Sequence, residues 1–109
     1  MRKILFVCTS GKDRSKACEE YFTKNNPENM YLACGINNYF TMTYNTLLVS
    51  ENLLKWADKI ICMESIHKKI IIDRYGKDYE DKMHLVNLGH WDKANIAQLI
   101  NKVEKLVTE

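Results

Sequence analysis

The sequence predicts an α/β protein with three layers, in which an open parallel sheet of about four strands carries helices on both faces. Short apolar runs alternate with segments of helical periodicity along the chain. This alternation is typical of parallel strands joined by crossover helices. The 109 residues suit one domain covering residues 1–109.

The first strand is expected over residues 3–7, because Ile4-Leu5-Phe6-Val7 is a continuous apolar run of the kind that is covered on both faces of a sheet. A loop follows from Cys8 to Asp13. A helix is expected over residues 14–24, with an apolar stripe at helical spacing formed by Ala17, Cys18, Tyr21 and Phe22.

The second strand is expected over residues 30–34, after Pro27 and before Gly35. Residues 36–46 are polar and aromatic, which favours a long loop. Ser50 is a suitable N-cap for the next helix, and the third strand is expected over residues 59–63.

A helix over residues 65–75 is predicted to end at Gly76, a residue type common after helix ends. The fourth strand is expected over residues 83–88. The last helix is expected to begin near Asp92, and its apolar residues recur at helical spacing: Ile96, Leu99, Ile100, Val103, Leu106 and Val107.

The net charge is only +2, from 16 basic and 14 acidic residues. Such a balance gives no support for nucleic-acid binding. The apolar run near the N-terminus is far too short for a signal peptide or a membrane span, so we expect a cytoplasmic protein without membrane contact.

Four cysteines are present, and together with His67, His84 and His90 they show no zinc-ligand spacing. We therefore expect no metal and no cofactor, and reduced intracellular thiols rather than disulfides. Cys18 and Cys62 lie in apolar patterns that indicate packing roles. A redox role for Cys34 or Cys18 beside Cys8 stays open.

Cys8 and Arg14 are separated by five residues directly after the first strand, and Ser15 follows. Seven residues can wrap around one tetrahedral oxyanion, with a thiolate below it and a guanidinium closing the far side. A helix starting at Arg14 or Ser15 would favour both the thiolate and a phosphate. The predicted phosphate-binding residues are Thr9, Ser10, Gly11, Lys12, Asp13, Arg14 and Ser15. A chance pairing of a buried cysteine with an arginine is the competing interpretation.

These residues resemble the phosphate loop of the low-molecular-weight protein tyrosine phosphatases. The resemblance runs from Ile4 through Cys8 to Ser15, and it continues at Ala33-Cys34-Gly35 and in residues 54–64, Leu-Lys-Trp-Ala-Asp-Lys-Ile-Ile-Cys-Met-Glu. It implies a four-stranded parallel sheet, Cys8 as nucleophile, Arg14 as phosphate ligand and Ser15 as support for the thiolate.

The loop departs from the family at three positions. Asp13 stands where a second cysteine is common, Gly11 where asparagine is common, and Lys16 where proline is common. Gly11 can adopt the left-handed conformation that asparagine would take there. An inward Asp13 would repel phosphate, whereas an outward one would do little harm, and Lys12 can offset its charge.

The family's proton donor is an aspartate in a loop before the last helix, and it corresponds here to Asp92, which lacks the usual following proline. Such an acid contributes roughly 10²–10⁴-fold to the rate. Asp92 also stands where the last helix needs an N-cap, so both roles stay open. Further candidate acids are Asp78, Asp81 and His90.

The leading hypothesis is a phosphatase that hydrolyses phosphotyrosine or a similar phosphomonoester through a cysteinyl-phosphate, without a metal. Its expected partners are a phosphotyrosine protein or a small phosphomonoester, and inorganic phosphate. Tyr39, Phe40 and Trp91 could wall a slot for an aryl group. Two alternatives are an arsenate reductase-like enzyme, which needs Cys34 or Cys18 to reach Cys8, and a non-catalytic phosphate- or phosphoprotein-binding module on the same fold.

Overall fold

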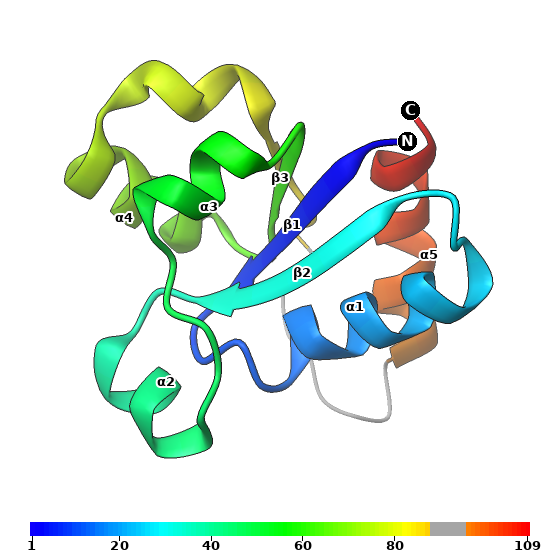
Figure 1. Cartoon of the computed structure of the whole chain (residues 1–109), viewed down its shortest axis with the longest axis horizontal. Helices are drawn as coiled ribbons and strands as arrows, with labels where there is room; N and C mark the ends of the chain where they lie inside the picture. The colour runs from blue at the N-terminus through cyan, green and yellow to red at the C-terminus, as the bar shows by residue number, and fades with distance from the viewer. Residues whose placement is uncertain (88–95) are drawn as a thin grey trace.

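The structure, a computed structural model, describes residues 1–87 and 96–109. Its sheet has four parallel strands in the order β2-β1-β3-β4 (Figure 1). Their bounds are β1 Lys3–Cys8, β2 Met30–Gly35, β3 Lys59–Cys62 and β4 Met83–Leu85. The predicted fold class is confirmed, although β4 is shorter than the expected residues 83–88.

The central strand β1 divides its side chains between two cores. Ile4, Phe6 and Cys8 point to one face of the sheet, and Leu5 and Val7 point to the other. All five are buried. The continuous apolar run therefore reflects a strand with no solvent face, as predicted.

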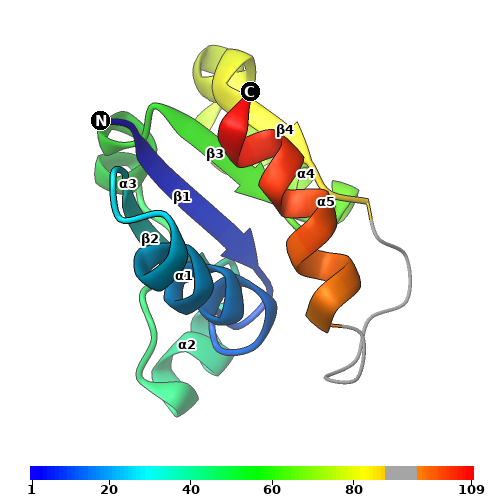
Figure 2. The same cartoon turned by 90° about the vertical axis from the view of Figure 1, so that its right-hand side faces the viewer.

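The first face is covered by α1 (Arg14–Asn25) and α5 (Ile96–Thr108) (Figure 2). Cys18 and Phe22 of α1 pack into this core, and α5 adds Leu99, Ile100, Val103 and Val107. The part of the last helix that was expected to begin near Asp92 lies outside the described residues.

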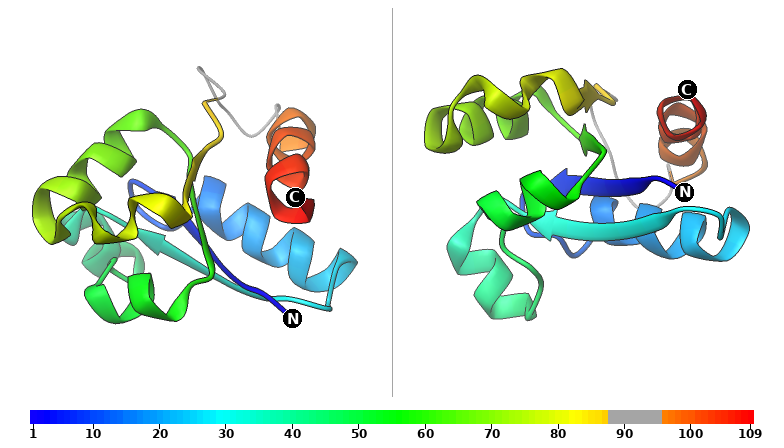
Figure 3. Two further views of the ribbon diagram at one scale, coloured as in Figure 1. Left: turned by 90° about the horizontal axis from the view of Figure 1, so that it is seen from above. Right: turned by 45° about the horizontal axis from the view of Figure 1, so that its top comes forward.

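The opposite face carries α3 (Glu51–Trp56) and α4 (Ser65–Tyr75), as the two views in Figure 3 show. Leu54 of α3 and Ile71 of α4 are fully buried against the sheet. The Ser50 side chain caps α3 by accepting the Leu53 N–H, which confirms the predicted N-cap.

One element was predicted wrongly, because residues 36–46 contain a helix, α2 (Asn38–Tyr44). Only one of its residues, Thr41, is buried, so the segment has no apolar stripe that periodicity could detect. Local bonds define its ends instead. The Asn37 side chain accepts the Phe40 N–H, and Asn45 ends the helix in the left-handed conformation.

A 3₁₀ helix, η1 (Lys77–Lys82), was also not predicted; it joins α4 to β4. Within the described residues, no helix is long and apolar enough to cross a membrane.

The chain leaves β1 to form β2 on one side of it and later returns to form β3 on the other side. Ligands in open α/β sheets bind beyond the carboxyl ends of strands at this kind of topological switch. The residues that follow β1, β2 and β3 converge there.

Candidate active site

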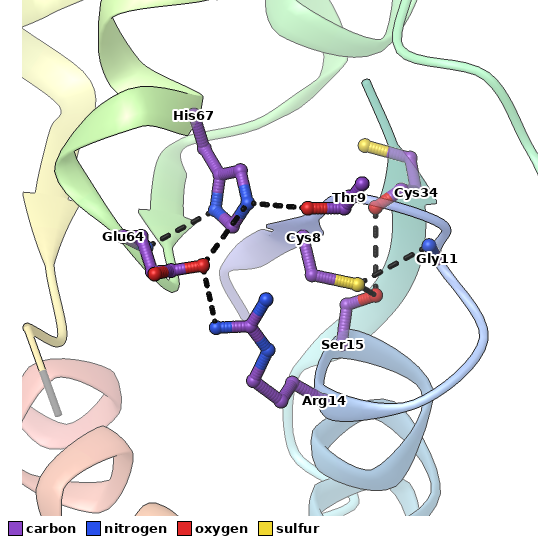
Figure 4. A network of polar contacts seen from close by, with 8 residues as sticks. All are labelled: Cys8, Thr9, Gly11, Arg14, Ser15, Cys34, Glu64 and His67. Carbon is purple, nitrogen blue, oxygen red and sulfur yellow. Dashed lines mark hydrogen bonds and ion pairs between the residues drawn. The ribbon is translucent and has the colours of Figure 1, made fainter. Parts of the chain in front are cut away.

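Cys8 is the last residue of β1, and its sulfur has two hydrogen-bonding neighbours (Figure 4). The Gly11 N–H donates to Sγ at 3.2 Å, and Ser15 Oγ lies 2.9 Å from Sγ. Ser15 Oγ also lies 3.4 Å from the Cys34 carbonyl oxygen. A hydroxyl has one proton, and the shorter distance favours its donation to the sulfur. Both contacts therefore suit a thiolate at the start of α1.

The loop after Cys8 turns the Thr9 and Ser10 carbonyl groups away from the sulfur, toward residues 36–46. Thr9 O accepts the Ile36 N–H at 3.1 Å and the Asn37 N–H at 3.0 Å, and Ser10 O accepts the Thr46 hydroxyl. In a trans peptide the N–H points opposite to the C=O, so these bonds turn the Ser10 and Gly11 N–H groups toward the sulfur side. Successive inward N–H groups form an anion-binding concavity.

Two glycines let this loop pack directly on the end of β2. A Cβ on Gly35 would lie 2.5 Å from the Ser10 carbonyl carbon, and one on Gly11 would lie 2.9 Å from Gly35 N. Gly11 has φ +74°, which confirms its predicted left-handed conformation. Main-chain contacts therefore shape this part of the loop.

Arg14 begins α1, and its guanidinium is held by a residue that follows β3. Arg14 Nη1 lies 2.9 Å from Glu64 Oε2. The exposed fraction is 17% for the arginine side chain and 41% for the glutamate side chain. Because β1 and β3 are neighbours in the sheet, their carboxyl ends bring these two residues together. Glu64 belongs to the stretch that carries the family resemblance, but sequence reasoning assigned it no role.

His67 of α4 is fully buried and connects two parts of the site. Its Nδ1 accepts the Glu64 N–H at 3.1 Å, and its Nε2 lies 3.1 Å from Thr9 Oγ1. Burial and, to a smaller extent, the nearby Arg14 charge lower the pKa of His67 to about 4, against the opposing effect of Glu64. The imidazole is therefore neutral at neutral pH.

Sequence reasoning missed His67. Its signal was the spacing Glu64-x-x-His67 at the start of a helix, where an N-cap residue and the third helical residue exchange hydrogen bonds. Histidine is an unusual third residue for that arrangement, so the pattern did not stand out.

Lys12 and Asp13 are the charged residues inside the loop. Lys12 is exposed, and its Nζ lies 4.2 Å from the centre of the Tyr44 ring at the end of α2. Asp13 precedes α1 as its N-cap residue, but its side chain makes no capping hydrogen bond. The Lys12 ammonium group therefore makes a cation–π contact with Tyr44, and this contact stabilises the packing of α2 beside the loop.

All four cysteines are free and buried. Cys34 packs in the core on the opposite face of the sheet from Cys8, and Figure 4 shows its side chain turned away from that sulfur. Burial raises the pKa of Cys18 to about 12 and raises that of Cys34 as well. Protonated thiols are poor nucleophiles, which weighs against a redox partner for Cys8.

The other candidate acids and aromatic residues are distributed as follows. Asp78 and Asp81 lie in η1, which leads into the amino end of β4. Cys8 lies at the carboxyl ends of the parallel strands, so the expectation that either aspartate could serve as the acid is wrong. Tyr39 and Phe40 lie on α2 with exposed fractions of 71% and 38%. The remaining candidates, His90, Trp91 and Asp92, lie outside the described residues.

No protein-family model and no curated protein sequence matches this chain. Solved structures do match it. One is the low-molecular-weight protein tyrosine phosphatase SP-PTP of Streptococcus pyogenes, with a TM-score of 0.80 and 16% identity, over 99% of this chain and 92% of that one. The chain has the low-molecular-weight phosphatase fold.

Two other structures of this fold are similar at the same level. The YwlE arginine phosphatase of Geobacillus stearothermophilus has a TM-score of 0.74 and 19% identity, over 99% of this chain and 94% of that one. Vibrio vulnificus Wzb in complex with benzylphosphonate has a TM-score of 0.75 and 16% identity, over 98% of this chain and 94% of that one.

Proposed function

We propose that this chain is a cysteine-dependent phosphatase in which Cys8 is the nucleophile and Arg14 and the loop of residues 9–15 bind the phosphoryl group. The observation that carries the proposal is the Cys8 sulfur itself. It lies at the N-terminus of α1 with the Gly11 N–H and the Ser15 hydroxyl beside it. These donors and the helix dipole favour the thiolate, and the same surroundings favour a bound oxyanion.

The proposed reaction has two steps. The Cys8 thiolate attacks phosphorus in line, so that an S–P bond forms, the P–O bond of the ester breaks, and the leaving oxygen takes a proton. Water then attacks the cysteinyl-phosphate and returns a proton to the group that protonated the leaving oxygen, the S–P bond breaks, and inorganic phosphate and the thiolate are released. Arg14 and the loop amides stabilise the equatorial oxygens, which is the electrostatic work that phosphoryl transfer needs.

Asp92 is the proposed proton donor, because the resemblance assigns this role to an aspartate in the segment before the last helix. Its role as an N-cap is the alternative. Asp92→Asn keeps the capping oxygen and removes the acid, whereas Asp92→Ala removes both. A catalytic acid predicts a large loss of kcat in both variants, whereas a cap alone predicts that Asp92→Asn keeps its rate.

We propose aryl phosphomonoesters, phosphotyrosine among them, as the substrate class. The exposed Tyr39 and Phe40 support an aryl group at this site, because Thr46, which follows α2, bonds the loop at Ser10 and so holds α2 beside it. The binding of benzylphosphonate, an arylmethyl phosphonate, by Wzb, which has the same fold, is consistent with this class. Phosphoarginine is a second candidate, because YwlE, an arginine phosphatase, also has this fold.

The four free cysteines support action in the reducing cytoplasm.

The experiment measures hydrolysis of p-nitrophenyl phosphate and of phosphoarginine by the wild type and by Cys8→Ser. We expect hydrolysis that vanadate inhibits, that EDTA does not change, and that is lost in Cys8→Ser. Hydrolysis that persists in Cys8→Ser would refute the mechanism. Phosphate binding without any hydrolysis would favour the binding module, and thiol-dependent consumption of arsenate would favour the reductase.

A further inference from the structure

His67 stands between the two parts of the site that must keep a fixed spacing. One of its nitrogens contacts Thr9, the first loop residue after Cys8, and the other contacts the main chain of Glu64, whose carboxylate holds Arg14. Figure 4 shows the ring lying between Thr9 and Glu64, on the side of Cys8 away from Gly11 and Ser15. A single buried ring thus spans from the phosphate loop to the support of the arginine.

The hydrogen-bond pattern determines which nitrogen carries the proton. A peptide N–H can only donate, so the bond from Glu64 N–H requires a bare Nδ1. The neutral ring then carries its proton on Nε2, which must donate to Thr9 Oγ1 at 3.1 Å. The bond from Glu64 N–H therefore leaves the neutral ring one tautomer, and the imidazole links the Glu64 donor to the Thr9 acceptor.

We propose that His67 is a positioning residue that acts through Thr9 to hold the start of the phosphate loop in its oxyanion-binding geometry, and through Glu64 to keep Arg14 in register with it. The inference rests on the proposed function, because it assigns the task of binding an oxyanion to the same loop.

Thr9 is the residue through which this link matters most. Its carbonyl is held from the β2 side by two N–H groups, those of Ile36 and Asn37. Its side chain is held from the α4 side by His67. Hydrogen bonds therefore fix Thr9 on both sides of the peptide that joins it to Ser10, and this peptide supplies the Ser10 N–H of the anion-binding concavity. Loss of the histidine bond leaves only the bonds to the Thr9 carbonyl and allows this peptide to rotate.

The chain offers matched variants for each half of the link. His67→Asn places an amide oxygen near the position of Nδ1, so it can keep the bond from Glu64 N–H but cannot reach Thr9. His67→Gln places an amide N–H near the position of Nε2, so it can keep the Thr9 bond at the expense of the other. Thr9→Val removes only the hydroxyl, and Thr9→Ser keeps a hydroxyl.

The test measures binding of inorganic phosphate by calorimetry and kcat/KM for p-nitrophenyl phosphate, at a temperature where thermal unfolding shows each variant folded. We expect Thr9→Val and His67→Asn each to lower the affinity for phosphate and kcat/KM about tenfold, because a small misplacement of binding groups has effects of this order. We expect Thr9→Ser to bind phosphate several-fold more tightly than Thr9→Val.

The decisive variant is the double one, Thr9→Val with His67→Asn. If both changes break the same bond, the double variant loses about tenfold rather than the roughly hundredfold that two independent effects would give. Additive losses, or unchanged phosphate binding in Thr9→Val, would overturn the inference. If His67→Asn does not fold, the Thr9→Val and Thr9→Ser pair alone decides.

Phosphate binding separates this inference from the proposed function. Coupled losses of phosphate affinity without any hydrolysis would uphold the positioning role and reject the enzyme. Normal hydrolysis that requires Cys8 but is insensitive to Thr9→Val would uphold the enzyme and reject the positioning role. A wild-type chain that binds no phosphate would reject both.

Discussion

The site has two flanks that are built differently. On the main-chain flank, residues 9–11 are held against residues 35–46, chiefly by carbonyl and N–H groups and by the contact between Gly11 and Gly35. On the side-chain flank, Arg14, Glu64 and His67 hold one another through side-chain atoms. We therefore expect a substitution that adds a side-chain atom to disrupt the main-chain flank most. On the side-chain flank, we expect each substitution that removes a hydrogen-bonding group to weaken phosphate binding by a smaller amount.

The largest effect is expected from Gly35→Ala on the main-chain flank. The new Cβ would lie 2.5 Å from the Ser10 carbonyl carbon and 2.7 Å from Thr9 O, so the loop has to move. We expect kcat/KM for p-nitrophenyl phosphate to fall on the order of 100-fold, because the amides that face Cys8 move with the loop. Overpacking also costs about 1–3 kcal/mol in the free energy of unfolding.

Gly76→Ala is the matched control for that substitution. Gly76 has φ +85°, and a Cβ there would meet no atom within 4 Å. The backbone strain costs roughly 1–3 kcal/mol. We expect a similar loss of stability with kcat/KM unchanged. An equal loss of activity in the two variants would show that Gly35 matters only through stability.

The second effect is a pH dependence of stability that originates in His67. The unfolded chain binds a proton on this residue below pH 6.5, whereas the folded protein resists protonation until its pKa of about 4. The unfolded state therefore holds more protons in this range, and the free energy of unfolding falls as the pH drops from 6.5 to 4. Integrated over this window, the loss is about 3 kcal/mol.

Urea denaturation of the wild type and of His67→Gln at pH 7 and pH 4.5 checks this prediction. Arg14 and Glu64 face the ring, and other carboxylates also titrate near pH 4, so the difference between the two proteins isolates the histidine. We expect the variant to lose clearly less stability on acidification. Equal losses in both proteins would mean that the imidazole is not held neutral by its surroundings.

Much of the main-chain flank could be predicted from the sequence. The apolar run that ends at Cys8, the glycine at position 11 and the spacing to Arg14 all report on local backbone geometry, and the structure confirms the strand, the left-handed glycine and the helix that starts at Arg14. Such features depend on neighbours in the sequence, which is why a single sequence reveals them.

The side-chain flank was largely missed because it depends on contacts between distant segments. His67 lies 58 positions after Thr9 in the sequence, and the pairing of β1 with β3 brings their elements together. The helix α2 was missed for the opposite reason. Its ends are set by the local Asn37 and Asn45 conformations, which carry no apolar periodicity.

The third effect concerns Glu64 on the side-chain flank. Glu64→Ala removes the partner of Arg14, and we expect kcat/KM to fall about tenfold because the guanidinium loses its fixed direction. Glu64→Gln keeps an oxygen that can accept from Arg14 Nη1, so most of the activity should remain. Stability should change by less than about 1 kcal/mol in both, because the glutamate side chain is 41% exposed.

Steady-state kinetics and thermal unfolding of the two glutamate variants decide which property of the residue matters. If Glu64→Gln falls as far as Glu64→Ala, the negative charge rather than the hydrogen bond controls Arg14. If neither variant changes kcat/KM, the side-chain flank does not contribute to phosphate binding in the way that its geometry suggests.

The smallest effect is expected from Thr46→Val, which removes a side-chain hydrogen bond between residues 9–11 and residues 35–46 on the main-chain flank. The Thr46 hydroxyl donates to Ser10 O, the carbonyl whose orientation turns the Gly11 N–H toward the Cys8 sulfur. Loss of one such bond costs about 1 kcal/mol, and the contact between Gly11 and Gly35 still holds the loop from the same side.

We therefore expect Thr46→Val to lower kcat/KM only about threefold, with Thr46→Ser closer to the wild type because it keeps the hydroxyl. Phosphate binding by calorimetry, measured beside Glu64→Ala, checks the ranking. A larger loss of phosphate affinity in Thr46→Val than in Glu64→Ala would reverse the comparison. It would mean that a side chain, rather than main-chain atoms, controls the loop on the main-chain flank.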